Sequence, residues 1–189
     1  MLLLVKFSLN SVVYYQSGST PETSNTSSKV LASGFKLYEN WEMTLDLKVL
    51  GPTNLWSNIL IVRKKGLQSG EYGSRIPRLV MSPNRILEIS ASLSANWNWY
   101  WDAPSPILYK NWFNLKLRHY DGKLQIFVDN VLNHEYINTY PQEWDDMELV
   151  LGSYPTPTIA EYKNFLYQGF PPGKFLFLEK NERKFYTQS

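Results

Sequence analysis

The chain contains no cysteine and only two histidines, His119 and His134, among its 189 residues. Without cysteine it has no disulfide scaffold, no thiolate metal site and no cysteine nucleophile. Two histidines also give little support to a zinc enzyme. Charged residues make up only 19% of the chain and the net charge is +2, so we expect no long-range attraction to nucleic acid or to anionic membranes.

Long apolar runs are also missing. The first apolar run extends only from Leu2 to Val5 before Lys6 interrupts it, whereas the apolar region of a signal peptide needs about 7–15 residues. No stretch approaches the roughly 18 apolar residues of a membrane span. We therefore expect a soluble chain whose first residues form a strand or begin a domain cut from a longer precursor.

Aromatic residues and alternating patterns are abundant instead. Trp, Tyr and Phe account for 15% of the chain, which excludes a disordered protein. Apolar and polar residues alternate with a period of two in 43–49, 113–119, 124–128 and 147–151. This alternation is typical of half-buried strands, and Asp121-Gly122 between two of them favours a tight hairpin turn. Short strands separated by turn signals predict an all-β sandwich or barrel.

The length allows one domain. We assign it residues 1–169 and expect residues 17–29, SGSTPETSNTSSK, to be an exposed loop because they have almost nothing to bury. Asn25-Thr26-Ser27 in that loop is a glycosylation sequon, which has meaning only in a secreted chain. Residues 170–189 contain an apolar Phe175–Leu178 run, which predicts a C-terminal extension or an edge strand.

The longest alternation covers 87–102, where Trp97, Trp99 and Trp101 share the parity of Leu87 and Ile89. Sixteen residues exceed one ordinary strand, so we expect a turn near residues 95–96. A two-residue loop at 95–96 would turn all three tryptophans away from the core. A three-residue loop at 95–97 would keep Trp99 and Trp101 on the Leu87 face, and the sequence leaves both arrangements open.

Three stretches together resemble a known family. They read NILIVRKKGLQSGEYGSRIPRL at 58–79, NWFNLKLRHYDGKLQIFVDNVL at 111–132 and INTYPQEWDDMELVLGSYPTPTIAEYKNFLY at 137–167. In this order they are similar to the concanavalin A-like (laminin G-like) jelly-roll modules of animal extracellular proteins. Within that family they resemble a poorly characterised branch with a YG-x-RIP motif, here residues 72–77, and an N-T-x-P stretch, here residues 138–141.

The resemblance implies a concanavalin A-like β-sandwich of two antiparallel sheets. It further implies an extracellular or secreted location as part of a larger protein, and binding of a glycan or an extracellular protein, sometimes with calcium. The chain departs from the branch at Ser74, where an Asp is usual; that Asp would form a charge-assisted pair with Arg75. It also lacks the cysteines that such modules often carry.

The cluster Trp-Asn-Trp-Tyr-Trp at 97–101 is the main candidate for a ligand site. Sugar rings stack their C–H faces on aromatic side chains and bind amides through their hydroxyls, so exposed tryptophans beside Asn98 suit a carbohydrate. The alternative is that these tryptophans fill the core. We predict a ligand site formed by Trp97, Asn98, Trp99 and Trp101 together with Tyr72 and Arg75 of the YG-x-RIP motif.

The predicted function is therefore non-catalytic binding of a carbohydrate or extracellular protein. One alternative is a laminarinase-type glycoside hydrolase using Glu143 and Glu148, whose E-x-D-x-x-E spacing resembles the catalytic motif of those enzymes. On a regular strand these two glutamates face opposite sides, so they would meet only across a bulge. Another alternative is a structural interaction module that pairs with its partner along a sheet edge.

No cofactor is predicted. Asp102, Asp121, Asp129 and Asn130 offer oxygen ligands for calcium, but the chain has no EF-hand-like spacing. His119 shares the parity of Leu115 and Leu117 and is expected to be a partly buried strand residue, whereas His134 is expected to be exposed after a strand end.

Overall fold

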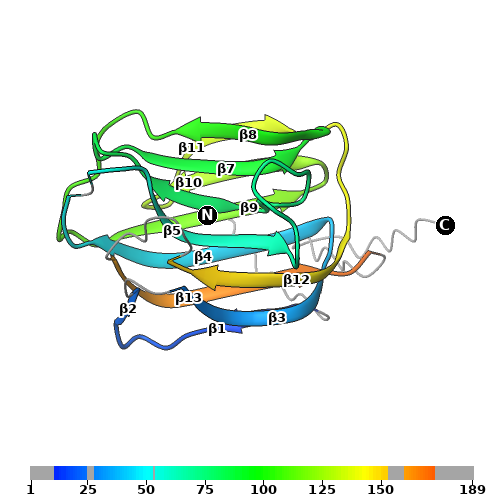
Figure 1. Cartoon of the computed structure of the whole chain (residues 1–189), viewed down its shortest axis with the longest axis horizontal. Helices are drawn as coiled ribbons and strands as arrows, with labels where there is room; N and C mark the ends of the chain where they lie inside the picture. Colours follow the sequence, from blue (N-terminus) through cyan, green and yellow to red (C-terminus); the bar gives the residue numbers. More distant parts are fainter. Residues whose placement is uncertain (1–10, 25–27, 53, 153–159, 173–189) are drawn as a thin grey trace, which may run out of the picture.

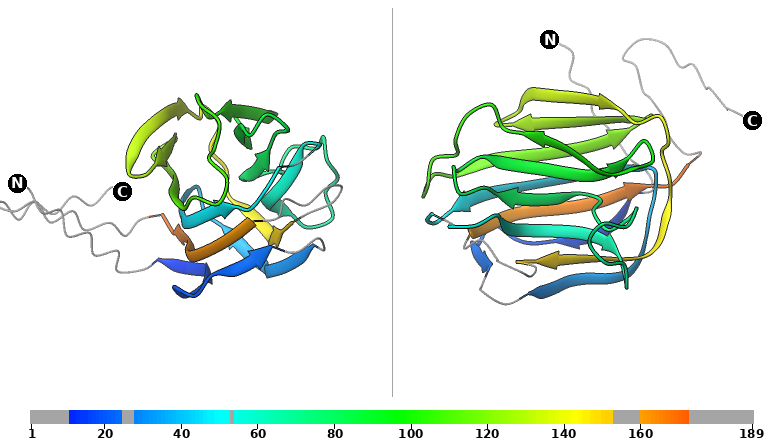
Figure 2. Two further views of the ribbon diagram at one scale, coloured as in Figure 1. Left: turned by 90° about the vertical axis from the view of Figure 1, so that its left-hand side faces the viewer. Right: turned by 45° about the horizontal axis from the view of Figure 1, so that its top comes forward.

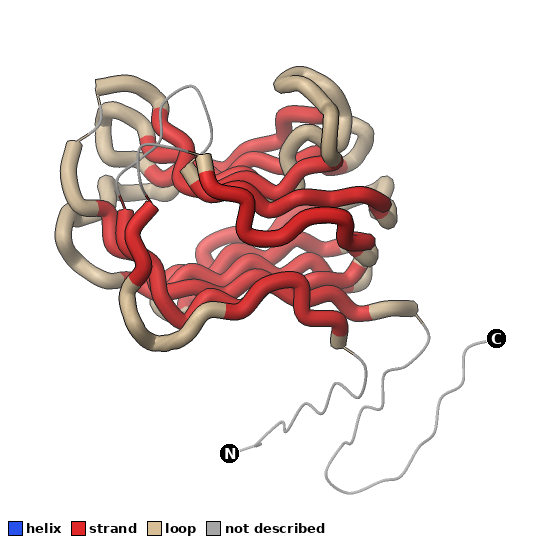
Figure 3. The backbone as a smooth tube through the Cα atoms, turned by 60° about the horizontal axis from the view of Figure 1, so that its bottom comes forward, coloured by secondary structure: helices blue, strands red, loops and turns tan. Residues whose placement is uncertain are grey.

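The fold is an all-β sandwich of two antiparallel sheets, which confirms the predicted fold class (Figures 1 and 2). The computed structural model describes residues 11–24, 28–52, 54–152 and 160–172. Within these ranges the chain contains strands and loops but no helix (Figure 3), and so no helix that could cross a membrane.

The first sheet, sheet A, has seven strands. Six of them follow the order β1-β13-β4-β9-β10-β11, and β2 pairs with β13 beside β1. The strands of sheet A are β1 (Val12–Gln16), β2 (Glu22–Ser24), β4 (Asn40–Val49), β9 (Phe113–Tyr120), β10 (Lys123–Val128), β11 (Val131–Ile137) and β13 (Ala160–Phe170).

The second sheet, sheet B, has six strands in the order β3-β12-β5-β6-β7-β8 and lies across the first sheet (Figure 2). Its strands are β3 (Lys29–Leu37), β5 (Ser57–Lys64), β6 (Arg78–Met81), β7 (Leu87–Leu93), β8 (Asn96–Asp102) and β12 (Trp144–Leu151). Neighbouring strands in both sheets are often far apart in the sequence, so the pairing joins segments from the whole chain.

The alternation seen in the sequence sets which side chains enter the core. Along β4 every second residue, from Trp41 to Val49, is buried, and the residues between them face solvent. The predicted hairpin is present: Asp121 and Gly122 both have positive φ angles (50° and 69°), and Tyr120 pairs with Lys123. Positive φ at both central residues is the geometry of the tight turn that Asp-Gly favours.

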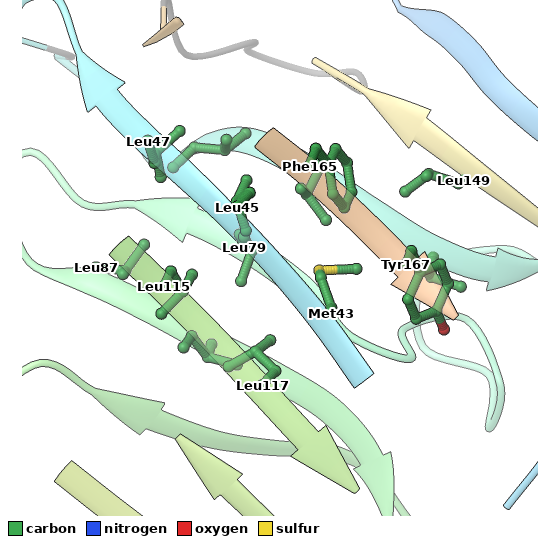
Figure 4. Close-up of a cluster of buried hydrophobic side chains, with 14 of the residues drawn as sticks. Met43, Leu45, Leu47, Leu79, Leu87, Leu115, Leu117, Leu149, Phe165 and Tyr167 are labelled. Atoms are coloured by element: carbon green, nitrogen blue, oxygen red, sulfur yellow. The ribbon is translucent and has the colours of Figure 1, made fainter. Parts of the chain in front are cut away.

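The core lies between the sheets and is built from long apolar side chains of both (Figure 4). Sheet A contributes Met43, Leu45 and Leu47, and sheet B contributes Leu79 and Leu87 on the facing side, all of them fully or almost fully buried. Burial of such side chains is the main stabilising term of a sandwich.

Four expectations from the sequence differ from the structure or fall on residues that it does not describe. Residues 17–29, where described, are mostly exposed as expected, but they include the short strand β2. The sequon residues 25–27 and the tail beyond residue 172 lie outside the described residues. His134 lies within β11 and is half-buried, not exposed after a strand end, whereas His119 is buried as expected.

Candidate functional site

The geometry of the β7–β8 hairpin determines which of the three tryptophans point into the sandwich. Its turn consists of Ser94 and Ala95, both with positive φ (51° and 60°), and Leu93 pairs with Asn96 across it. The next aligned pair is Ala91 with Trp99, so β8 has one more residue than β7 between the two pairs. This is a β-bulge, in which Trp97 and Asn98 together oppose a single residue, Ser92.

The bulge returns Trp99 and Trp101 to the inner side of the sheet. Trp101 pairs with Ile89, and both tryptophans pack against the core. Trp99 stacks on His134 and Tyr136 of β11, with ring centroids 5.8 and 4.7 Å apart. These rings join the edge strands of the two sheets in an aromatic seam. Trp99 and Trp101 therefore take the inward arrangement, one of the two that the sequence left open, and lie apart from Trp97 and Asn98 of the predicted ligand site.

Trp97 lies on the outside of the sandwich with two of the other predicted residues. Its side chain is 36% exposed, and the Arg75 guanidinium lies over its ring, 4.6 Å from the centroid. The same guanidinium donates hydrogen bonds to Oδ1 of Asn98 and to Oγ of Ser69. Tyr100, 56% exposed, projects from the same side of β8.

Arg78 extends this cluster along the outer face of sheet B. It pairs with Ser90 of β7, which in turn pairs with Tyr100 of β8, so the three residues form a row across the strands. The Arg78 Nε donates to Oδ1 of Asn58 at 2.5 Å. We name this group of residues the arginine patch; it consists of Arg75, Arg78, Trp97, Asn98 and Tyr100.

Arg75 and Arg78 lie close enough for their charges to interact, and both side chains are partly removed from solvent. Burial and, to a smaller extent, the neighbouring charge of Arg75 lower the pKa of Arg78 to about 10, while the Glu88 carboxylate acts in the opposite direction. Burial also lowers the pKa of Arg75, which is only 8% exposed, and Glu88 partly offsets this by raising it. The patch therefore holds two guanidinium groups that burial disfavours.

The β3–β4, β5–β6, β7–β8 and β11–β12 connections lie together at one end of the sandwich, at the right of Figure 1. Residues of these connections and of the strands beside them line a separate pocket. Its empty volume is about 250 Å³, including space open to solvent. We name it the end pocket; it is lined by Glu39, Trp41, Tyr72, Ile76, Ser92, Leu93, His119, Asn138, Tyr140, Gln142 and Trp144.

The YG-x-RIP and N-T-x-P stretches meet at the end pocket. Tyr72 packs its ring against Trp144 at 5.3 Å, and Gly73 adopts a φ of +96° directly beside the same indole. A Cβ atom on Gly73 would lie 2.5 Å from Cζ3 of Trp144, so only glycine fits there without displacing the ring. Tyr72 is thus half-buried in the pocket wall, apart from Trp97 and Asn98.

The floor of the end pocket is a closed hydrogen-bond network. Nδ1 of His119 lies 2.6 Å from the carbonyl oxygen of Glu39, and Nδ2 of Asn138 lies 3.0 Å from Nε2. Since a carbonyl only accepts, Nδ1 carries the proton and Nε2 accepts from Asn138. Oδ1 of Asn138 accepts from the backbone N–H groups of Ser94 and Tyr140. Burial lowers the pKa of His119, in keeping with a neutral ring.

This network explains the Asn of the N-T-x-P stretch. Asn138 ties the β11–β12 connection to the β7–β8 turn and to β9, and Oγ of Ser94 accepts a further bond from the N–H of Thr139 at 2.9 Å. The polar groups of the floor satisfy one another. The arrangement therefore serves to hold the end of the sandwich together.

The two glutamates of the hydrolase alternative are each bound to a different cation. Glu143 forms an ion pair with Lys36 at 2.6 Å, and Glu148, on the outer face of β12, binds Nε of Arg63 at 2.7 Å. The pairing of β12 with β3 is irregular between Trp144 and Glu148, so a bulge does separate the two glutamates. Elsewhere, no group of three or more His, Asp or Glu side chains in the described ranges is placed to hold a metal ion.

Two residues of the arginine patch were missed by the sequence analysis. Tyr100 has the opposite parity to the tryptophans and was assigned no role, and Arg78 follows directly after the YG-x-RIP motif. The sequence gives no outward parity signal for Arg78, because Val80 has the same parity and is as fully buried as Leu79. Strand pairing alone places Arg78 and Tyr100 in one row, with Ser90 between them.

Similar solved structures share the sandwich. The carbohydrate-binding module CBM40 of the Ruminococcus gnavus IT-sialidase, bound to α2,3-sialyllactose, matches 82% of this chain and 93% of its own, with 8% identity and a TM-score of 0.54. Trypanosoma rangeli sialidase matches 69% of the chain (12% identity, TM-score 0.54), and this chain spans only 20% of that protein's length. The alginate lyase AlyC3 matches 78% of this chain and 73% of its own (13% identity, TM-score 0.52). At these identities the likeness shows the fold alone. No family model matches the sequence, and no curated protein sequence matches it.

Proposed function

We propose that this chain is a non-catalytic module that binds carbohydrate on the outer face of sheet B, at the arginine patch. One observation carries the proposal: an exposed indole, an exposed phenol, an amide and two guanidinium groups lie together on strands and on the loop beside them. Aromatic rings offer a sugar its stacking surface, and the amide and guanidinium groups bind its hydroxyls. Strands hold such a surface more rigidly than loops alone.

The structural neighbours support this proposal because they include a carbohydrate-binding module with a bound sialylated sugar. They also include a sialidase and alginate lyases, so the neighbours alone do not distinguish binding from catalysis. The residues of this chain provide the argument against the hydrolase alternative. Glu143 and Glu148 are each held by a cation, and a general acid must instead be free to give up a proton. We therefore favour binding without catalysis.

We further propose, from the resemblance to laminin G-like modules, that the chain acts outside the cell as part of a larger protein. Binding to an extracellular protein is the second ligand class that the resemblance implies. The edge strand β11 offers an observation in its favour, because Val131, Leu132 and Ile137 on it are each about half exposed or more. A glycan remains the better fit to the arginine patch, which combines aromatic and polar groups.

The test is to titrate the folded protein with immobilised or soluble glycans while following tryptophan fluorescence. A neutral quencher should reach both Trp97 and Trp56, which are 36% and 49% exposed. In a Trp56→Phe background, replacement of Trp97 by Phe should therefore remove most of the remaining quenchable signal, whereas Trp99→Phe and Trp101→Phe should not. Glycan binding should fall in Trp97→Ala.

The matched control is Trp112→Ala, because Trp112 also has cations over its ring, Lys48 and Lys163, but its contacts lie on sheet A. If Trp112→Ala lowers glycan binding and Trp97→Ala does not, the arginine patch is not the site. If the wild type releases reducing sugar from a glucan and Glu148→Gln loses this activity, the hydrolase alternative is supported instead.

A further inference from the structure

Neither arginine of the arginine patch forms an ion pair with a carboxylate among the described residues. None of the ion pairs formed by the described residues includes Arg75 or Arg78; the cations in those pairs are Lys29, Lys36, Lys48, Arg63 and Lys123. The hydrogen-bond partners of the two guanidinium groups are neutral, namely Asn98, Ser69 and Asn58. This holds although Arg75 is only 8% exposed.

A buried cation without a counter-charge is costly, and proteins normally pair it. Arg63 shows the usual solution on the same face of the same sheet, where its Nε binds the Glu148 carboxylate at 2.7 Å. Glu88 of β7 interacts electrostatically with both arginines but forms no ion pair with either. Burial raises the pKa of Glu88, and Asp102, its pairing partner on β8, raises it further. Two carboxylates therefore lie near the arginines, but neither binds a guanidinium group directly.

The missing partner can come from a ligand. A guanidinium presents planar pairs of N–H donors that match the two oxygens of a carboxylate, and bonds of this charged kind are stronger than neutral ones. Trp97 and Tyr100 flank the two arginines with exposed rings, and Asn98 lies between them on the bulge. One ligand uses all of these groups at once: a sugar whose ring carries a carboxylate.

We infer that the arginine patch selects acidic carbohydrates, with Arg75 and Arg78 binding the carboxylate and Trp97 and Tyr100 contacting the sugar rings. The inference rests on the proposed carbohydrate binding and adds the class of sugar. It assigns Arg78, which lies outside the YG-x-RIP motif, to the binding site.

The experiment compares glycans that differ only in the carboxylate. An array carries uronic-acid oligosaccharides and sialylated glycans, each beside its carboxyl-reduced form. It also carries sulfated oligosaccharides that have no carboxylate. Wild type should bind the carboxylated members at least about tenfold more tightly than their reduced forms, as expected for charge-assisted bonds. This preference should weaken as salt is raised, because exposed charge interactions are screened.

Variants then locate the preference. Arg78→Gln should abolish the preference, and Arg78→Lys, which keeps the charge but not the fork, should keep only part of it. Arg118→Gln is the matched control, since Arg118 lies on sheet A over the Tyr120 ring and should leave the preference intact. Thermal unfolding of each variant checks that it is folded; if Arg78→Gln is not, Arg75→Lys and Arg78→Lys carry the test.

The outcomes separate the two proposals. Equal binding of acidic and reduced glycans would leave carbohydrate binding standing and overturn the role of the arginines. A preference that survives in both Arg78→Gln and Arg75→Lys would place the acidic site elsewhere. Binding of sulfated but not carboxylated sugars would overturn the inference that the patch recognises a carboxylate. Absence of binding to every glycan would overturn the proposed function itself and this inference with it.

Discussion

Trp97 and Trp99 lie two residues apart on one strand, yet they belong to different parts of the molecule. Trp99 is half-buried in the aromatic seam with His134 and Tyr136, whereas Trp97 lies outside over Arg75. Side chains two apart on a regular strand share a face. The bulge at Trp97 and Asn98 breaks that rule, so a single extra residue separates a structural tryptophan from a candidate ligand-binding one.

The largest expected difference concerns the stability contributed by these two tryptophans. Trp99→Ala should lower the free energy of unfolding by about 3 kcal/mol, because it removes a large ring packed against the core. Trp97→Ala should change it by only about 0.5 kcal/mol, as surface substitutions usually do. Urea denaturation of both variants measures the difference. Equal losses would mean that Trp97 also stabilises the sandwich and would weaken its assignment to a ligand.

Gly73 lies between the arginine patch and the end pocket, because it is two residues before Arg75 and lies beside Trp144 of the end pocket. Gly73→Ala should cost about 2 kcal/mol, since it combines a strained backbone with a side-chain clash. Gly70→Ala is the control: Gly70 also has a positive φ, +106°, but nothing lies within 4 Å of its added Cβ. A stability loss in Gly70→Ala as large as that in Gly73→Ala would show that the Trp144 contact adds nothing.

The closed network of the end pocket predicts a pH dependence that the arginine patch does not. Burial holds the pKa of His119 below its usual value, so the unfolded chain takes up the proton first as pH falls below about 6.5. Stability is therefore fully present above that pH and is lost as pH falls toward the folded pKa, by at most about 1.4 kcal/mol per pH unit. Protonation would also make Nε2 a donor facing the Asn138 amide.

Chemical denaturation between pH 5 and pH 8 measures this slope. His119→Asn should flatten it relative to wild type, whatever its effect on absolute stability. An unchanged slope in His119→Asn would mean that other groups carry the pH dependence.

The smallest effect concerns the turn that precedes the bulge. Ala95 adopts a φ of +60°, which glycine tolerates better than alanine. Ala95→Gly should stabilise the protein by about 0.5 kcal/mol, because the relief of strain exceeds the added flexibility of the unfolded chain. Thermal unfolding measures it, and glycan binding should not change. A loss of binding would show that the turn residue itself shapes the arginine patch.

Much of the fold was predictable because it depends on local patterns. The alternation along 43–49 and 113–119 marks the core faces of β4 and β9, and Asp121-Gly122 marks the turn that joins β9 to β10. Neither of the two turns considered for residues 87–102, a two-residue loop at 95–96 or a three-residue loop at 95–97, is the one found. The structure has a two-residue turn at 94–95 and reaches the inward placement of Trp99 and Trp101 through a bulge, which no side-chain pattern announces.

The candidate site was predicted only in part for the same reason. Trp97, Asn98 and Arg75 do lie together, but Tyr72 lies in the wall of the end pocket and Trp99 and Trp101 lie in the seam. Arg78 and Tyr100 join the patch only through strand pairing.

The sequence by itself determined the composition of the two faces of each strand, since side-chain alternation is a property of any extended chain. It also determined the glycines and tight turns that allow the strands to pair. The tertiary structure alone decided the register of β8 against β7, and with it which tryptophans are inside. It also brought two arginines together without a direct ion pair to a carboxylate, because charge pairing depends on distances between segments that only the folded sandwich fixes.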